Sequence, residues 1–160
     1  MNSPSMSPTH QPGPPNRAKR IFLIDDHPVL RNGLAAFIHK EGDLEISGQA
    51  DTAEQVMKAL RSAPVDLIIL DLNLTGKSGL EFIKDVRIEF PRTLILVFSF
   101  NAEQLYAERA LHAGANGYLM KLASEETILK AIRKVLAGEV YVSENISSTI
   151  LENFAGRAPT

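Results

Sequence analysis

The sequence predicts a doubly wound α/β domain over residues 19–138, in which helices cover both faces of a five-stranded parallel sheet. Five short apolar runs alternate with five segments whose apolar residues recur at helical spacing. The connections are only a few residues long, so each helix returns the chain and successive strands run parallel. Right-handed crossovers between these strands then place helices on both faces of the sheet.

The expected strands are short and largely apolar. They lie at residues 20–24, 44–50, 65–70, 93–100 and 116–120. The runs 21–24 and 67–70 contain no alternating polar residues, which is typical of central strands covered on both faces. These two runs therefore belong in the middle of the sheet.

The expected helices are separated by proline and glycine. They lie at residues 28–40, 52–63, 79–90, 102–113 and 124–137. Pro28 suits a first helical turn, Pro64 and Pro91 stop the second and third helices, and Gly114 and Gly138 close the last two. The apolar residues at helical spacing in the first three helices are Val29, Leu30, Leu34, Phe37, Ile38, Val56, Met57, Leu60, Leu80, Ile83, Val86, Ile88 and Phe90.

Composition excludes several classes of protein. The 160 residues match one ordinary domain, and the 44% apolar fraction is sufficient for a core. A net charge of −2 gives no bulk electrostatic attraction for nucleic acid or anionic membranes. The absence of cysteine excludes disulfides and thiolate metal sites and fits a reducing compartment. No apolar run approaches the roughly 20 residues that span a bilayer, so we expect a soluble, cytoplasmic protein without a membrane partner.

The two ends of the chain differ from the domain between them. Residues 1–18 are rich in Pro, Ser, Asn and Gln without the apolar stretch of a secretory signal, so we expect a disordered leader. Residues 139–160 are expected to be a linker with a short helix that Ser143 caps. The apolar stripe on that helix consists of Ile146, Ile150, Leu151 and Phe154.

Polar side chains follow four of the five strands. They are Asp25 and Asp26 after the first strand, Asp71 and Asn73 after the third, Ser99 on the fourth and Lys121 after the fifth. In a doubly wound fold the ligand site lies beyond the carboxyl ends of the strands, so we expect these side chains to meet there. Taken singly, each has an ordinary explanation as a helix cap, a turn residue or a solvated lysine. Their combination favours a functional site.

The expected site suits phosphoryl transfer with a metal ion. The three carboxylates would repel one another unless a hard cation such as Mg²⁺ joined them, with the backbone carbonyl of Asn73 as a further ligand. Lys121 adds a positive charge and Ser99 a hydroxyl. Metal and lysine would then stabilise the transferring phosphoryl group while Asp71 acts as the in-line nucleophile.

These motifs resemble the receiver domain of two-component response regulators, over residues 19–138. The segment "IDDHPVLRNGL" resembles the family's acidic pair, and "LIILDLNLTGKSGLEFIK" resembles its phosphoacceptor segment. The resemblance implies a flavodoxin-like sheet of order 2-1-3-4-5 and a sensor histidine kinase that phosphorylates Asp71 with Mg²⁺. It also implies that Ser99, Lys121 and Tyr118 form the phosphate-binding and switch positions. Without the resemblance, a half-exposed aromatic residue of a strand is an equally good interpretation of Tyr118.

The segments "AGANGYLMK" and "AIRKVLAGEVYVS" resemble in particular the NarL-like branch, whose output is a LuxR-type helix-turn-helix. This implies transcription regulation, with DNA bound only through an output domain that does not follow here. It also implies a homodimer on phosphorylation, through either of two helix faces, and no catalysis beyond the chain's own phosphorylation and dephosphorylation. We expect a receiver separated from its output domain, a stand-alone receiver being the alternative.

Two other functions are alternatives to a phosphorylated receiver. Thr75 and Leu122 replace prolines that are usual in the family, and "SFNAE" replaces the branch's usual stretch after the switch hydroxyl. These departures leave a phosphorylation-independent, receiver-like adaptor as the main rival. A metal-dependent phosphohydrolase is disfavoured, because it would need a carboxylate at position 73 as general acid.

Overall fold

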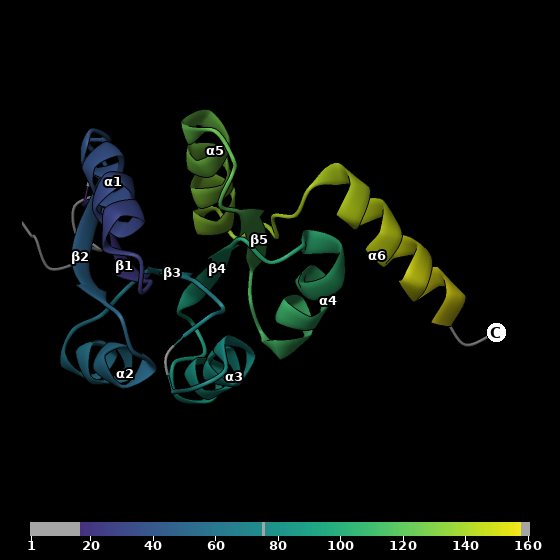
Figure 1. Cartoon of the computed structure of the whole chain (residues 1–160), viewed down its shortest axis with the longest axis horizontal. Helices are drawn as coiled ribbons and strands as arrows, with labels where there is room; N and C mark the ends of the chain where they lie inside the picture. The colour runs from purple at the N-terminus through teal and green to yellow at the C-terminus, as the bar shows by residue number, and fades with distance from the viewer. Residues whose placement is uncertain (1–16, 75, 158–160) are drawn as a thin grey trace, which may run out of the picture.

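The structure is a computed structural model that describes residues 17–74 and 76–157 (Figure 1). Its strands are β1 (Lys19–Ile24), β2 (Leu44–Ala50), β3 (Leu67–Leu70), β4 (Leu94–Ser99) and β5 (Gly117–Met120). Its helices are α1 (Pro28–His39), α2 (Ala53–Ser62), α3 (Gly79–Glu89), α4 (Glu103–Ala113), α5 (Glu125–Leu136) and α6 (Glu144–Arg157). The strands are all parallel in the order β2-β1-β3-β4-β5, which confirms the expected fold.

Two apolar clusters cover the two faces of the sheet. Buried residues of α1 and α5 pack on one face, and those of α2, α3 and α4 pack on the other. In Figure 1, α1 and α5 lie above the sheet and α2 and α3 below it. All four residues of β3 are buried, as expected for a strand that is covered on both sides.

Some of the apolar helical residues lie outside the core. Val29 and Ile88 are more than 80% exposed, and Leu30 lies at the surface near the start of α1. Ile88 follows the buried Val86 by two residues, about 200° around the helix, so it faces solvent. Phe82, which the stripe omitted, is fully buried instead.

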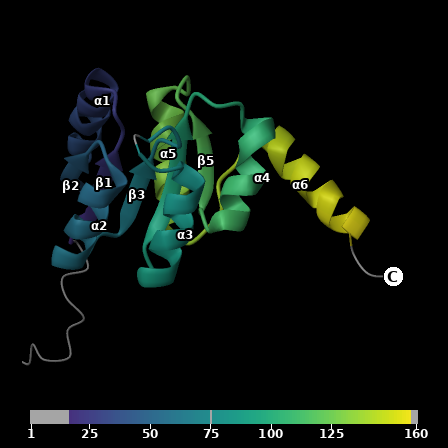
Figure 2. The same cartoon turned by 60° about the horizontal axis from the view of Figure 1, so that its bottom comes forward.

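The linker helix is longer than expected. α6 has 14 residues, and the Oγ atom of Ser143 accepts a hydrogen bond from the amide of Ile146 at 3.3 Å, which confirms the predicted cap. Ile146 is buried and Ile150 packs partly against the same cluster as α4, beside which α6 begins (Figures 1 and 2). The side chains of Leu151 and Phe154 lie outside the description.

Two further expectations concern residues that the structure does not describe. The disordered leader falls mostly on residues 1–16, and the altered turn at Thr75 falls on the gap between 74 and 76. Among the described helices, none combines the length and the apolar character needed to cross a bilayer.

The register of the sheet decides which side chains meet at its carboxyl edge. Ile24 lies opposite Leu70, Leu70 opposite Val97, and Ser99 opposite Met120. The residues that follow β1, β3 and β5 therefore emerge next to one another, close to the end of β4.

Candidate functional site

Asp71 is held at the edge of the sheet by its own backbone. Its amide donates a hydrogen bond to the carbonyl oxygen of Ile24 at 3.0 Å, which continues the pairing of β3 with β1 for one residue. The residue is 2% exposed. Its Oδ1 atom accepts a hydrogen bond from the amide of Asn73 at 3.0 Å, which leaves Oδ2 directed at the other polar groups. A carboxylate this buried needs charged or hydrogen-bonding partners.

Lys121 supplies the positive charge. Its amide donates to the carbonyl oxygen of Ser99 at 2.9 Å, and its side chain has no exposed surface. The Nζ atom lies 2.5 Å from Asp25 Oδ2 and 2.9 Å from Asp71 Oδ2. The lysine therefore joins the residues that follow β1 and β3 from a position after β5. Lysine is almost never fully buried unless it is paired in this way.

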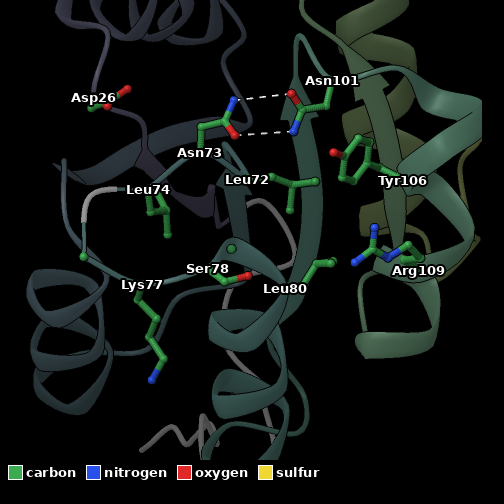
Figure 3. A pocket seen from close by; sticks show the side chains of 12 residues that line it. Asp26, Leu72, Asn73, Leu74, Lys77, Ser78, Leu80, Asn101, Tyr106 and Arg109 are labelled. Atoms are coloured by element: carbon green, nitrogen blue, oxygen red, sulfur yellow. Dashed lines mark hydrogen bonds between the residues drawn. The ribbon is translucent and has the colours of Figure 1, made fainter.

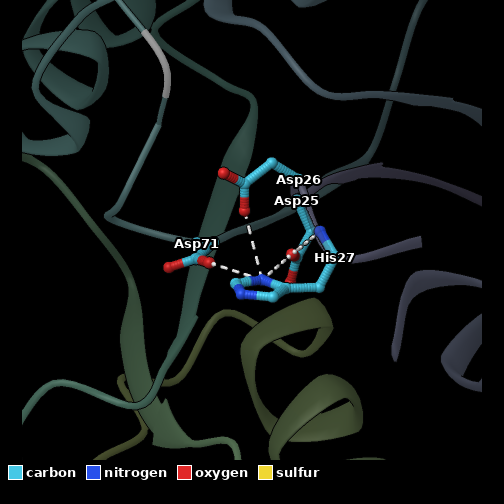
Figure 4. Close-up of side chains that lie close together, drawn as sticks. All are labelled: Asp25, Asp26, His27 and Asp71. Atoms are coloured by element: carbon cyan, nitrogen blue, oxygen red, sulfur yellow. Dashed lines mark hydrogen bonds and ion pairs between the residues drawn. The ribbon is translucent and has the colours of Figure 1, made fainter. Parts of the chain in front are cut away.

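The acidic residues converge as predicted. Asp25 is buried, whereas the side chain of Asp26 is 37% exposed. Ligand atoms of Asp25, Asp26, His27 and Asp71 all lie within 4.8 Å of one another (Figure 4). Lys121 pairs with two of the three carboxylates, Asp25 and Asp71. A hard divalent cation fits this donor set, because such cations prefer carboxylate and carbonyl oxygens.

His27 is a member of this cluster that the sequence reasoning left without a role. Its Nδ1 atom lies 2.8 Å from Asp25 Oδ1 and 3.1 Å from Asp26 Oδ1. The only signal in the sequence was its position directly after two aspartates, together with the ability of imidazole to bind metals. Nothing in the sequence indicated that the ring turns inward.

Asn73 contributes its backbone to the site and its side chain to the rim. Its side-chain amide forms two reciprocal hydrogen bonds with Asn101, both at 3.4 Å (Figure 3). The side chain therefore points away from Asp71. This pair lines a cavity of about 760 Å³ between the β3–α3 loop and α4, with Asp26, Tyr106 and Arg109 among the other lining residues.

Ser99 and Tyr118 meet at the backbone of Asn101. The Oγ atom of Ser99 accepts a hydrogen bond from the amide of Asn101 at 3.0 Å, and the hydroxyl of Tyr118 donates to its carbonyl oxygen at 2.7 Å. Tyr118 has no exposed surface, and burial raises the pKa of its phenol to about 12. The half-exposed strand aromatic that the sequence alone suggested is therefore wrong. Ser99 and Tyr118 are coupled through the start of the loop that leads into α4.

The two further departures in the sequence directly follow Ser99 and Lys121 along the chain. Phe100 is 49% exposed, with Lys121 Nζ 5.2 Å from its ring centroid and His27 edge-on at 6.3 Å. Leu122 is 81% exposed, and every peptide bond between described residues is trans. Phe100 therefore places exposed apolar surface beside Lys121 and His27.

The fold and this site together define a class: a flavodoxin-like domain that gathers an acidic cluster, a buried lysine and a hydroxyl at the carboxyl edge of its sheet. Residues 21–133 match the model of the response regulator receiver domain. The chain belongs to that family.

Individual relatives agree with this assignment. The chain is 38% identical over 141 residues to the nitrate/nitrite response regulator protein NarL of Escherichia coli. The matched region covers 88% of this chain and 65% of that protein. It is similar to the crystal structure of a LuxR-family two-component response regulator from an Aurantimonas species, with a TM-score of 0.79, 30% identity and coverage of 86% and 99%. The receiver domain of a NarL regulator from Mycobacterium tuberculosis has a TM-score of 0.72, 27% identity and coverage of 77% and 99%. The chain thus spans slightly less than two thirds of the E. coli NarL protein and nearly all of the M. tuberculosis receiver domain.

Proposed function

We propose that this chain is the phosphoacceptor switch of a two-component system, which takes a phosphoryl group from a sensor histidine kinase onto Asp71. The observation that carries the proposal is the buried lysine: Lys121 Nζ contacts both Asp25 and Asp71 at the edge of the sheet. A cation fixed beside a carboxylate that is itself held in place is the arrangement that stabilises a phosphoryl group in transfer.

The transfer forms one bond and breaks one. A carboxylate oxygen of Asp71 attacks the phosphorus atom, and the bond from phosphorus to the kinase's histidine nitrogen breaks. The electron pair stays on that nitrogen. The hydrogen bond from the Asn73 amide to Oδ1 of Asp71 orients the carboxylate, which leaves Oδ2 as the candidate attacking atom. Lys121 then neutralises part of the charge on the phosphoryl oxygens.

The acidic cluster would hold Mg²⁺ through Asp25, Asp26 and Asp71, with the backbone carbonyl of Asn73 as a further ligand. Bound Mg²⁺ supplies positive charge that offsets the charge of the phosphoryl group and the mutual repulsion of the carboxylates. The chain's own contribution is to hold Asp25 and Asp71 together away from bulk solvent, since both residues are buried.

Phosphorylation would be read out through Ser99, Asn101 and Tyr118. The phosphoryl group adds close to two negative charges, which attract Lys121 and the hydroxyl of Ser99. The Oγ atom of Ser99 and the hydroxyl of Tyr118 both form hydrogen bonds with the backbone of Asn101. A shift of Ser99 would therefore move Asn101, alter the hydrogen bond of Tyr118 and shift the start of α4. The function is then signalling, with no catalysis on a separate substrate.

We also propose the partners and location that the relatives suggest: a cytoplasmic regulator that forms a homodimer and controls transcription through a separate DNA-binding domain. The face formed by α1 and α5 is the favoured dimer surface. Tyr141 pairs with Gly117 at the outer edge of β5, and α6 packs beside α4, so the chain's own residues partly cover the alternative face.

Intact-mass spectrometry of the chain after incubation with acetyl phosphate and Mg²⁺ tests the proposal. We expect a gain of one phosphoryl group, which is lost in Asp71→Asn and in a sample with a metal chelator. Asp51→Asn, at an exposed aspartate just after β2, is the matched control and should still gain the group. If the chain stays unmodified both with acetyl phosphate and with a phosphorylated histidine kinase of the NarL branch, the phosphorylation-independent adaptor replaces this proposal.

A further inference from the structure

We propose that His27 is a ligand of the divalent cation and sets the cation preference of the site. This inference rests on the proposed function only in placing the cation among Asp25, Asp26 and Asp71. It adds a nitrogen donor to a set that otherwise consists of oxygens. The consequence is a site that takes Mg²⁺ but binds divalent transition metals more tightly.

The first argument is the position of the imidazole nitrogen. His27 Nδ1 lies 2.8 Å from Asp25 Oδ1, 3.1 Å from Asp26 Oδ1 and 3.6 Å from Asp71 Oδ2 (Figure 4). Adjacent ligands of an octahedral ion with bonds of about 2.1 Å are about 3.0 Å apart. The spacing of the nitrogen from Asp25 Oδ1 and Asp26 Oδ1, the first of which it contacts at hydrogen-bond distance, is close to that of neighbouring ligands in one coordination shell, and Asp71 Oδ2 lies 0.5 Å or more further away.

The second argument is that the backbone and the neighbouring residues fix the ring. His27 is the residue before α1, and Pro28 restricts it to the extended conformation that it adopts, with φ −106° and ψ 93°. Its amide donates to Asp25 Oδ1 at 2.7 Å, and its ring packs edge-on against Phe100. The orientation of the His27 ring is thus fixed before any cation binds, and this lowers the entropic cost of coordination.

The third argument is that Lys121 and His27 approach the acidic cluster from different positions, one buried and one partly exposed. Lys121 approaches Asp25 and Asp71 with a fully buried side chain, whereas the His27 side chain is 49% exposed. Lys121 Nζ and His27 Nδ1 are 3.4 Å apart, so the two nitrogens border the cluster at neighbouring points. An ammonium group has no lone pair and cannot bind a metal, so the imidazole is the nitrogen that a cation could coordinate.

The chemical consequence concerns selectivity. Mg²⁺ prefers oxygen ligands and retains water, whereas Ni²⁺ and other later divalent metals gain more from an imidazole nitrogen. With three carboxylates alone, the site would prefer Ni²⁺ over Mg²⁺ only because Ni²⁺ binds most ligands more tightly. A correctly placed imidazole increases that preference, so removal of the imidazole should reduce Ni²⁺ binding much more than Mg²⁺ binding.

Calorimetric titration of the chain with Mg²⁺ and with Ni²⁺ at one fixed pH tests the inference. His27→Phe keeps an aromatic ring next to Phe100 but removes the ligand nitrogen. His39→Phe makes the same change at an exposed histidine of α1 and controls for unspecific binding to histidine. We expect His27→Phe to weaken Ni²⁺ binding by about tenfold or more and to change Mg²⁺ binding by less than about threefold.

Electron spin-echo spectroscopy of the Mn²⁺-loaded chain gives a direct second readout. Nitrogen hyperfine coupling should be present in the wild-type chain and in His39→Phe, and absent in His27→Phe. Unchanged Ni²⁺ affinity or retained nitrogen coupling in His27→Phe would overturn the inference. Equal losses of affinity for Mg²⁺ and Ni²⁺ in His27→Phe would also overturn it, because they would mean that His27 only supports the loop. Tighter Mg²⁺ binding in His27→Phe would overturn it as well, because it would mean that the ring competes with the cation. Phosphorylation of the wild-type chain with Mg²⁺ tests the proposed function separately.

Discussion

The Nζ atom of Lys121 lies 2.9 Å from Oδ2 of Asp71, and neither side chain is more than 1% exposed. These two residues are 50 positions apart and follow β5 and β3, which are not neighbours in the sheet. The long lysine side chain passes the end of β4 to reach the aspartate. The ion pair therefore joins the segments that follow β3 and β5, across the intervening β4, at the point where we propose that the phosphoryl group is received.

Removal of the lysine should destabilise the domain. In Lys121→Met, the carboxylates of Asp25 and Asp71 remain buried without their cation, and loss of one partner of a buried pair costs about 3–5 kcal/mol. Urea unfolding in the absence of divalent ions measures this loss. Lys130→Met, on the exposed face of α5, should change the free energy of unfolding by no more than about 0.5 kcal/mol. Equal stability of the two variants would show that the pair is not essential.

Removal of the exposed carboxylate should weaken metal binding without disturbing the fold. Asp26→Ala takes away the one carboxylate of the cluster that is open to solvent, so we expect Mg²⁺ affinity to fall by about tenfold or more. Asp51→Ala changes an exposed aspartate after β2 that is not part of the cluster. Calorimetry that finds the same Mg²⁺ affinity in both variants would exclude Asp26 as a ligand.

The buried phenol of Tyr118 should make the domain less stable in alkali. Its pKa is raised to about 12 by burial, so the neutral form is favoured in the folded state. This contribution is complete below the unfolded pKa of about 10 and is lost as pH rises through about 12. The free energy of unfolding should therefore fall more steeply with pH in the wild type than in Tyr118→Phe. Identical slopes would contradict the burial of the hydroxyl.

Two glycines should respond in opposite ways to the same substitution. A Cβ atom at Gly79 would lie 2.6 Å from the backbone of Leu72, beside Asp71, whereas one at Gly33 would meet nothing within 4 Å. Gly79→Ala should therefore cost about 1–3 kcal/mol as α3 moves away from the loop. Gly33→Ala, inside α1, should raise the free energy of unfolding by about 0.5–1 kcal/mol. Thermal unfolding of the pair checks both signs; a stabilised Gly79→Ala would contradict the close approach.

The sequence was sufficient for the parts of the site that depend on topology. Strand ends meet in a parallel sheet, so the positions of Asp25, Asp71 and Lys121 followed from the alternation of strands and helices. Positions that depend on side-chain packing did not follow. The inward ring of His27 and the burial of Tyr118 depend on contacts with Phe100 and Asn101, which belong to another strand and its loop.

Helical spacing was similarly informative only in part. It identified the buried Ile83 and Val86 of α3, because these residues repeat every three to four positions. It also included Ile88, which lies on the solvent side. An apolar residue near the end of a helix can match the helical spacing of apolar residues even though no other helix or strand covers it.

Chemical trapping of the phosphorylated residue tests the central claim most directly. Borohydride reduces an aspartyl phosphate to homoserine, and peptide mass spectrometry then identifies the modified position in the chain treated with acetyl phosphate and Mg²⁺. We predict homoserine at position 71 and at no other aspartate. Homoserine at position 25 or 26, or none in a chain that has gained a phosphoryl group, would contradict the assignment of Asp71 as the acceptor.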